Sequence, residues 1–132
     1  MKPKVIVDTS VWIQYFRRAD SEEKREVDFL LEDNRAVLVG ITLSEVLQGT
    51  KDEGEFNILR SALGALPFCQ SSFDTWAKAG YISHLLRRRG TIIPLSNSLI
   101  AALALENDYL VYTLDPHFKQ IENLKLYQPE LS

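Results

Sequence analysis

Short β-branched runs alternate with longer amphipathic segments along this chain of 132 residues. Residues 5–7 and 37–39 are continuously apolar, as in strands buried on both faces. Residues 109–113 predict another strand, and Ile92 with Ile93, just before Pro94, a short one. This alternation predicts an α/β fold, a three-layer α/β/α sandwich around a mostly parallel central sheet, with residues 1–132 forming a single domain.

Helices are expected between these strands because apolar residues recur there at three- and four-residue spacing. The expected helices cover residues 9–16, 21–33, 42–49, 56–66, 72–89 and 96–105, with a shorter one restarting at Pro116 and a last short strand over 124–127. Within 72–89 an apolar face carries Phe73, Trp76, Ala77, Gly80, Tyr81, His84 and Leu85. That face predicts that His84 packs in the core.

The amino-acid composition indicates the cellular compartment. Cys69 is the single cysteine, which excludes a disulfide framework, indicates a reducing compartment and predicts a small buried hydrophobe. No stretch has the roughly 20 apolar residues of a membrane helix, and the first residues lack a signal-peptide pattern. We therefore expect a cytoplasmic protein with no membrane partner.

Net charge is −3, which argues against attraction of the whole molecule to nucleic acid. Local basic groups then matter more, and Arg87, Arg88 and Arg89 form one at the end of a predicted helix. Favourable placement against the helix dipole explains them, and RNA contact is the alternative.

Oxygen-bearing side chains follow the predicted strands. Asp8 and Asp115 come just after strands, at the edge where open α/β sheets bind ligands. Glu45 and Asn97 follow the second strand and the Ile92–Ile93 segment closely enough to reach the same edge. The sequence therefore predicts that four polar side chains from separate segments converge on one crevice.

Clustered carboxylates repel one another by roughly 4 kcal/mol at about 4 Å and an effective dielectric near 20. Such a cluster needs a cation or bound protons, and hard Mg²⁺ or Mn²⁺ ions prefer oxygen ligands. The ordinary alternatives stay open: Asp8 and Asp115 are also well placed as helix N-caps, Glu45 could pair with an arginine, and Asn97 could simply begin a helix.

Four segments resemble the PIN-domain family, and specifically its VapC-type toxins: "VIVDTSVWI", "ITLSEVLQG", "IIPLSNSLIAALALEND" and "LVYTLDPHF". They occur in the family's order over residues 4–118. The resemblance implies a Mg²⁺- or Mn²⁺-dependent endoribonuclease acting on RNA, frequent homodimers and inhibition by a cognate antitoxin. It implies catalytic and metal-binding roles for Asp8, Glu45 and Asp115 and supporting roles for Thr9 and Ser10.

Asn97 departs from the family, which normally has aspartate at this position. An amide keeps a carbonyl oxygen but removes a negative charge, so we expect weaker metal binding and slower cleavage. A non-catalytic PIN-like module that binds RNA or protein is the second interpretation. A phospho-acceptor signalling domain is the third, although only one acid follows the first strand.

Two further groups have an ordinary and a functional interpretation. Trp12, Tyr15 and Phe16 crowd the first helix, which predicts an exposed apolar patch that contributes to an antitoxin groove. His117 lies two residues beyond Asp115, where a surface or packing role is favoured over a general acid or base.

Overall fold

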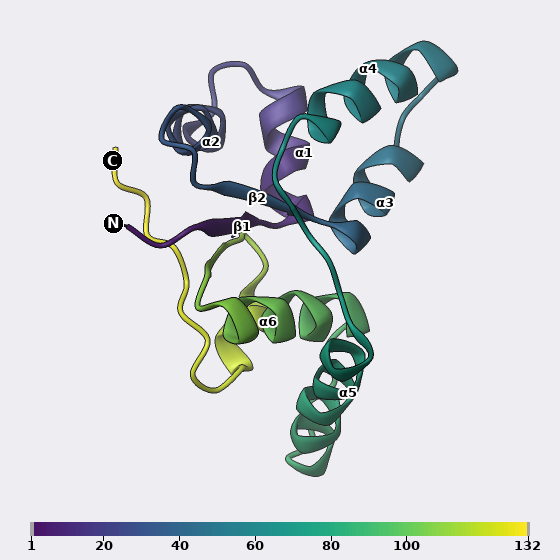
Figure 1. Ribbon diagram of the computed structural model, residues 1–132, viewed down its shortest axis with the longest axis vertical. Coiled ribbons are helices and arrows are strands. Elements are labelled where there is room, and N and C mark those ends of the chain that lie inside the picture. Colours follow the sequence, from purple (N-terminus) through teal and green to yellow (C-terminus); the bar gives the residue numbers. More distant parts are fainter. Residues whose placement is uncertain (1, 132) are drawn as a thin grey trace.

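A parallel sheet lies at the centre of the computed structural model, which describes residues 2–131 (Figure 1). Within these residues the strand order is β3-β2-β1-β4. β1 (Val5–Val7) pairs with β2 (Ala36–Val39) on one side and with β4 (Leu110–Tyr112) on the other. β3 (Phe68–Cys69) extends the sheet beyond β2. All three pairings are parallel, so the carboxyl ends of β1 and β4 meet at one edge.

Helices cover both faces of this sheet, which confirms the predicted three-layer architecture (Figure 1). One layer contains α1 (Thr9–Arg17), α2 (Glu22–Glu32), α3 (Gly40–Gln48) and α4 (Glu53–Gly64). The other contains α5 (Phe73–Arg88), α6 (Leu95–Asn107) and the 3₁₀ helix η1 (Pro116–Gln120). None of the helices in residues 2–131 is both long and apolar enough to cross a membrane.

Alternating strand residues build the two cores. Val5 and Val7 pack with the α1–α4 layer, whereas Ile6 packs with the α5–α6 layer. Each such side chain contributes about 1.5–3 kcal/mol when it leaves water completely. Between the sheet and α5, α6 is buried along residues 97–104 and therefore needs apolar or small residues on every side.

Local signals fix the ends of several helices. Ser21 caps α2 by accepting a hydrogen bond from the Lys24 amide, and Ser72 forms a capping box with Thr75 at the start of α5. Gly90, with φ of +83°, follows α5 in the left-handed conformation that glycine adopts without strain.

Three expectations about strands were incomplete or wrong. Ile92 and Ile93 form a loop, and Pro94, which follows them, cannot donate a ladder hydrogen bond. Leu126 makes only an isolated bridge to Val111, so residues 124–127 do not form a full strand. The two-residue β3 was not expected, and Cys69 is half-buried at this edge strand rather than packed in the core.

The predicted apolar face of α5 is not buried. Its residues Phe73, Trp76 and Tyr81 are exposed, and so is His84, which was wrongly expected in the core. α5 turns Ala79 and Leu86 toward the core instead. Because α5 packs on α6 and not directly on the sheet, a narrow strip of small and aliphatic side chains is enough to hold it.

Candidate active site

Asp8 stands immediately after β1 and is almost completely buried. Its Oδ2 accepts hydrogen bonds from Ser10 Oγ and Thr113 Oγ1, each at 2.8 Å. Although Asp8 occupies the N-cap position of α1, its side chain makes no capping bond to the helix. The capping alternative therefore does not explain this carboxylate.

Two hydroxyls join the carboxyl ends of β1 and β4. Ser10 Oγ accepts a hydrogen bond from the Leu114 amide at 3.0 Å, and Thr113 Oγ1 accepts one from the Asp115 amide at 2.9 Å. Thr113 thus donates to Asp8 while it orients the backbone of Asp115. Because each hydroxyl donates to one segment and accepts from the other, the two strand ends are held in register.

Asp115 follows β4 and is the second carboxylate of this network. Its Oδ2 accepts from Asn97 Nδ2 at 2.9 Å, and its Oδ1 lies 2.9 Å from the His117 amide and 2.7 Å from His117 Nδ1. Asp115 therefore does cap η1, as the ordinary interpretation expected. Burial raises the pKa of Asp115, but the hydrogen bonds from Asn97 and His117 outweigh it and hold the pKa below its ordinary value.

Asn97 lies in the first turn of α6 and is buried. It reaches the edge from a helix and not from a strand end, because residues 91–94 form a loop. Its amide nitrogen donates to Asp115, so the neutral side chain stabilises the neighbouring carboxylate. An aspartate at this position would place a second negative charge there.

Glu45 reaches the same region from α3. Its Oε1 accepts a hydrogen bond from Thr9 Oγ1 at 2.7 Å, and Thr9 directly follows Asp8 in the chain. No salt bridge within residues 2–131 involves Glu45, so the arginine-pair alternative is wrong for this structure. Thr113 thus links Asp8 to Asp115, and Asn97 donates to Asp115. Glu45 is connected to this network through Thr9, the residue that follows Asp8 in the chain.

These side chains present oxygen donors, the chemistry that hard divalent cations prefer. In the part of the chain that the structure describes, no three Asp, Glu, His or Cys side chains are already gathered as a metal-binding group. The carboxylate oxygens are instead engaged by hydroxyl, amide and imidazole groups. The donor set suits Mg²⁺ or Mn²⁺, provided that the carboxylates exchange some of these hydrogen bonds for the ion.

A cleft of about 350 Å³ begins beside Glu45 and runs between α1, α3 and α4. Apolar side chains line it, among them Ile13, Phe16 and Leu59. Trp12 does not contribute, because it is buried in the core and stacks on Phe16. The predicted exposed patch with Trp12 was therefore wrong, and only Phe16 of that pair reaches the cleft.

The basic group predicted as an RNA contact lies at the end of α5. Arg87 and Arg88 are exposed, and Arg89 lies 3.8 Å from Glu122. No hydrogen bond in residues 2–131 links these three arginines to the carboxylate network. Their RNA contact stays a prediction.

The sequence did not lead us to predict that Thr113 and His117 take part in this network. Thr113 looked like the end of a strand, although its place two residues before Asp115 is the signal that could have identified it. His117 was expected on the surface, and it is exposed but still hydrogen-bonds Asp115. Both residues lie two positions from Asp115 in the chain: Thr113 Oγ1 accepts from the Asp115 amide, and His117 Nδ1 hydrogen-bonds the Asp115 carboxylate.

The fold and this edge define a class: a parallel α/β protein in which acidic residues follow adjacent strands and are linked by hydrogen bonds at the carboxyl ends of those strands. A model of the PIN domain family matches residues 5–124, and the chain belongs to the PIN domain family. Ribonuclease VapC11 of Mycobacterium tuberculosis is 28% identical over 124 residues, which cover 91% of this chain and 92% of that protein.

Solved structures share the fold at lower identity. DNA-bound VapBC from Salmonella typhimurium aligns with a TM-score of 0.81 at 21% identity, over 96% of this chain and 98% of that chain. A toxin–antitoxin complex from Klebsiella pneumoniae aligns with a TM-score of 0.71 at 23% identity, over 96% of this chain and 98% of that one.

Proposed function

We propose that this chain is a metal-dependent endoribonuclease and the toxin of a toxin–antitoxin pair, with residues 1–132 acting as one nuclease domain. The observation that carries the proposal is the hydrogen-bonded network of Asp8, Thr113, Asp115 and Asn97 at the edge of the sheet. Relatives named as ribonucleases and structural neighbours described as toxin–antitoxin complexes support it. An RNA substrate and a single cysteine both favour the reducing cytoplasm as its place of action.

Asp8, Asp115 and Glu45 would hold the ion through their carboxylates, and Asn97 would add its amide oxygen. A bound Mg²⁺ or Mn²⁺ supplies an activated water and stabilises charge on the phosphodiester. Ser10 and Thr113 keep the Asp8 carboxylate oriented through their hydroxyl donors. Thr9 does the same for Glu45 from the segment next to Asp8.

Restoring the acid at position 97 tests this assignment. We expect Asn97→Asp to raise Mg²⁺ or Mn²⁺ affinity and RNA cleavage by about 10–100-fold, because a carboxylate adds the charge that an amide lacks. Calorimetric metal titration and cleavage of a labelled RNA, with EDTA as the blank, measure the two effects.

Asn107→Asp is the matched control, since it makes the same change at the exposed end of the same helix. It should alter neither quantity. If Asn97→Asp gains nothing in either assay, position 97 is not part of the metal site.

The second candidate is a PIN-like module that binds RNA or protein and cuts weakly or not at all. Asn97 favours it, because its amide already satisfies Asp115 without a cation. RNA binding by the unaltered chain that is insensitive to EDTA and produces no cleavage, even with Asn97→Asp, would support this module over the enzyme.

The cleft between α1, α3 and α4 is the surface that we propose for the antitoxin. Its apolar lining, which also contains Arg17 and Lys51 beside Glu45 and Glu55, suits an amphipathic segment that places its apolar face in the cleft. Leu59→Glu should weaken binding of the cognate antitoxin while metal-dependent cleavage continues. Equal inhibition of this variant and the unaltered chain by the antitoxin would exclude the cleft.

A further inference from the structure

Another pocket, of about 260 Å³, adjoins the carboxylate network. It lies between the start of α2, the end of β4 and the C-terminal segment 126–129, and is called here the α2–β4 pocket. Thr113 lines this pocket and also donates to Asp8, so the pocket and the network share a residue. Pockets for drug-sized ligands measure roughly 300–1,000 Å³, so this space suits one smaller group held next to the network.

Tyr112 lines the pocket with a hydroxyl that has no partner. The residue is only 3% exposed, and its ring centroid lies 5.1 Å from that of Tyr127. Tyr127 donates its hydroxyl to Glu26, whereas the Tyr112 hydroxyl makes no hydrogen bond within residues 2–131. Among these residues only Trp12 Nε1 and Thr42 Oγ1 are both unpartnered and fully enclosed, so the Tyr112 hydroxyl is open to the pocket. A buried hydroxyl normally has a partner, which a ligand in the pocket can supply.

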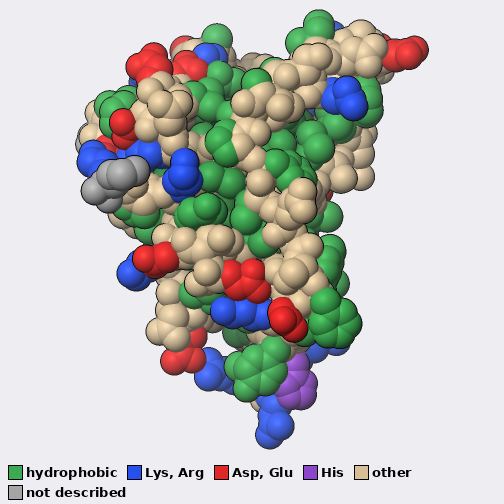
Figure 2. Space-filling model, in the orientation of Figure 1, with side chains coloured by type: hydrophobic (Ala, Val, Ile, Leu, Met, Phe, Trp, Pro, Cys, Tyr) green, Lys and Arg blue, Asp and Glu red, His purple; other side chains and the backbone are tan. Residues whose placement is uncertain are grey.

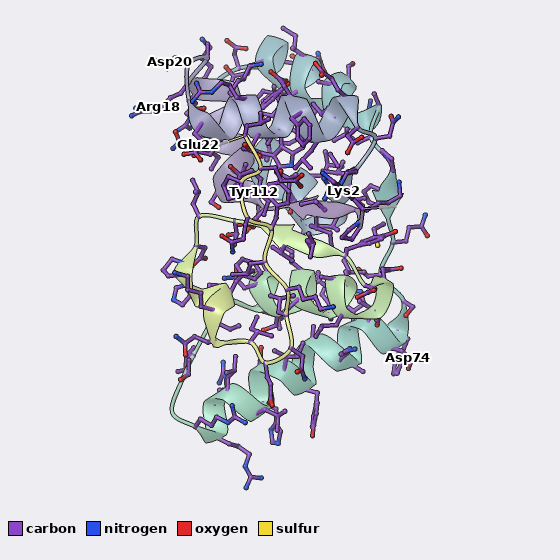
Figure 3. The ribbon with its side chains drawn as sticks, turned by 90° about the vertical axis from the view of Figure 1, so that its left-hand side faces the viewer. Lys2, Arg18, Asp20, Glu22, Asp74 and Tyr112 are labelled. Carbon is purple, nitrogen blue, oxygen red and sulfur yellow. The ribbon has the colours of Figure 1, made fainter. Side chains whose placement is uncertain are left out.

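Two uncommitted carboxylates line the pocket with this hydroxyl. Glu22 and Glu23 lie in the first turn of α2, and neither side chain takes part in a salt bridge within residues 2–131. Burial and then the nearby Glu23 raise the pKa of Tyr112, so its hydroxyl keeps its proton and can donate. Figure 3 shows Glu22 and Tyr112 near the yellow C-terminal segment, and Figure 2 shows acidic side chains over α2. The α2 dipole explains acids at this position but not the unpartnered hydroxyl.

A ligand of this pocket must donate to carboxylates and accept from a hydroxyl. Guanine does both, because its N1–H and N2 amino donors lie side by side next to the O6 acceptor. Adenine and cytosine instead place a ring acceptor beside the amino group, where it would face a carboxylate that only accepts. An unpaired base also has apolar faces, which match the pocket residues Leu114 and Pro129.

Two other ligands match the pocket less well. A guanidinium group has no acceptor, so an arginine from a protein partner would leave the Tyr112 hydroxyl donor unmatched and would lie near the Lys119 ammonium. A divalent cation needs several oxygen ligands, and no group of three acidic, histidine or cysteine side chains able to hold one occurs in residues 2–131.

We propose that the α2–β4 pocket binds one unpaired guanine base of a single-stranded RNA. The Glu23 carboxylate accepts from N1–H and from the N2 amino group, and the Tyr112 hydroxyl donates to O6. Glu23 has this part because it is less exposed than Glu22. The inference rests on the proposed function, since it names the base that is held beside the cleaved phosphodiester.

Binding without cleavage tests the pocket. In EDTA, amide chemical shifts of the full chain are followed by NMR as a short uridine oligoribonucleotide with one guanosine is added. The same oligonucleotide with inosine lacks only the N2 amino group. We expect shifts at residues 22–23, 112–114 and 126–128, and a Kd about tenfold or more higher with inosine, because a hydrogen bond to a charged group is lost.

Two variants separate the contacts. Glu23→Gln should bring the guanosine and inosine Kd values within about twofold of each other, because the amide no longer accepts both donors. Tyr112→Phe should weaken both about equally, since both bases keep O6, and should not destabilise the fold, because the hydroxyl has no partner to lose. Glu32→Gln at the exposed end of α2 and Tyr109→Phe, just before β4, are the matched controls and should change neither Kd.

Several results would overturn the proposal. These are an oligonucleotide that shifts none of the named residues, equal Kd values for guanosine and inosine, or a preference that survives Glu23→Gln. Shifts at the pocket with argininamide and none with the oligonucleotide would assign it to an arginine of a protein partner. Cleavage is measured separately with Mg²⁺ or Mn²⁺. A chain that prefers guanosine but cuts no RNA would retain the pocket and refute the ribonuclease, and a chain that cuts RNA without this preference would do the reverse.

Discussion

The buried carboxylate of Glu26 and the carboxylates of the candidate site have different hydrogen-bond partners. Glu26, on α2, is fully buried. It accepts from Tyr127 Oη at 2.7 Å and from the amides of Glu130 at 2.9 Å and Leu131 at 2.7 Å. At the candidate site, Thr113 donates to the Asp8 carboxylate and accepts from the Asp115 amide, the Asp115 carboxylate accepts from Asn97, and Glu45 accepts from Thr9.

The difference distinguishes a structural carboxylate from those that we propose as metal ligands. Three neutral donors compensate for the buried charge of Glu26, so it needs no cation and holds the C-terminal segment against α2. At the site, Glu45 lies beside the cleft, and hydroxyl and amide groups hydrogen-bond the carboxylates of Asp8 and Asp115. This arrangement can accept an ion in exchange for those hydrogen bonds.

The largest expected effect is on activity at the site. Asp8→Asn should lower metal-dependent RNA cleavage by more than about 100-fold, because it removes a charged ligand from the proposed ion. Its unfolding free energy should change by only about 1 kcal/mol, since the amide oxygen still accepts from Ser10 and Thr113. Single-turnover cleavage and urea unfolding measure both. Full activity in this variant would remove Asp8 from the mechanism.

The next largest effect is on stability: here the free energy of unfolding should change and cleavage should not. Glu26→Ala should destabilise the chain by about 3 kcal/mol, because it leaves a buried hydroxyl and two amides without their acceptor. Cleavage per folded molecule should be unchanged. Glu32→Ala, at the exposed end of the same helix, is the control and should be nearly neutral. Comparable losses of stability in both variants would show that helix propensity, and not the buried network, is responsible.

The two groups also differ in how far sequence could predict them. Asp8 and Asp115 follow apolar runs, so their common edge follows from the rules of parallel sheets. Glu26 lies within a charged stretch, "EEKREVDFLL", where nothing distinguishes a buried acid from its exposed neighbours. Its partners lie about a hundred residues away, so the contact depends on how the chain returns. The role of Thr113 was missed because a hydroxyl at a strand end carries no periodic signal.

The fold was largely predictable where apolar residues are continuous or regularly spaced. β1, β2, β4 and the helices follow from apolar spacing, and Gly90 ends α5 as expected. Spacing failed at α5, whose aromatic face is exposed while Ala79 and Leu86 enter the core. Apolar periodicity identifies an apolar face of a helix, but it does not show whether that face packs inside the molecule. It failed also at Ile92 and Ile93, which form a loop and pair with no strand of the sheet in residues 2–131.

A smaller effect tests whether Thr113 positions the carboxylates. Thr113→Val should lower cleavage about tenfold, since Asp8 loses a donor and the Asp115 amide loses its acceptor. Thr42→Val is the matched control, because Thr42 Oγ1 is buried without a hydrogen-bond partner in residues 2–131. Losing that hydroxyl should be neutral or stabilising. If Thr113→Val affects stability but leaves cleavage and metal affinity unaltered, Thr113 only joins the strand ends.

The smallest effect lies at the border of the Glu26 network and depends on pH. Hydrogen bonds from Lys2 and then Arg35 lower the pKa of Glu130 despite the opposing effect of burial. A carboxylate with a lowered folded-state pKa stabilises the fold above its unfolded pKa, and this contribution is lost as pH falls through the folded pKa. Glu130→Gln should therefore destabilise by less than about 1 kcal/mol at neutral pH and by nothing at strongly acidic pH. Urea unfolding of both chains across that range measures it. An equal difference at every pH would assign the effect to packing, and the charge of Glu130 would then contribute nothing to holding the C-terminal segment.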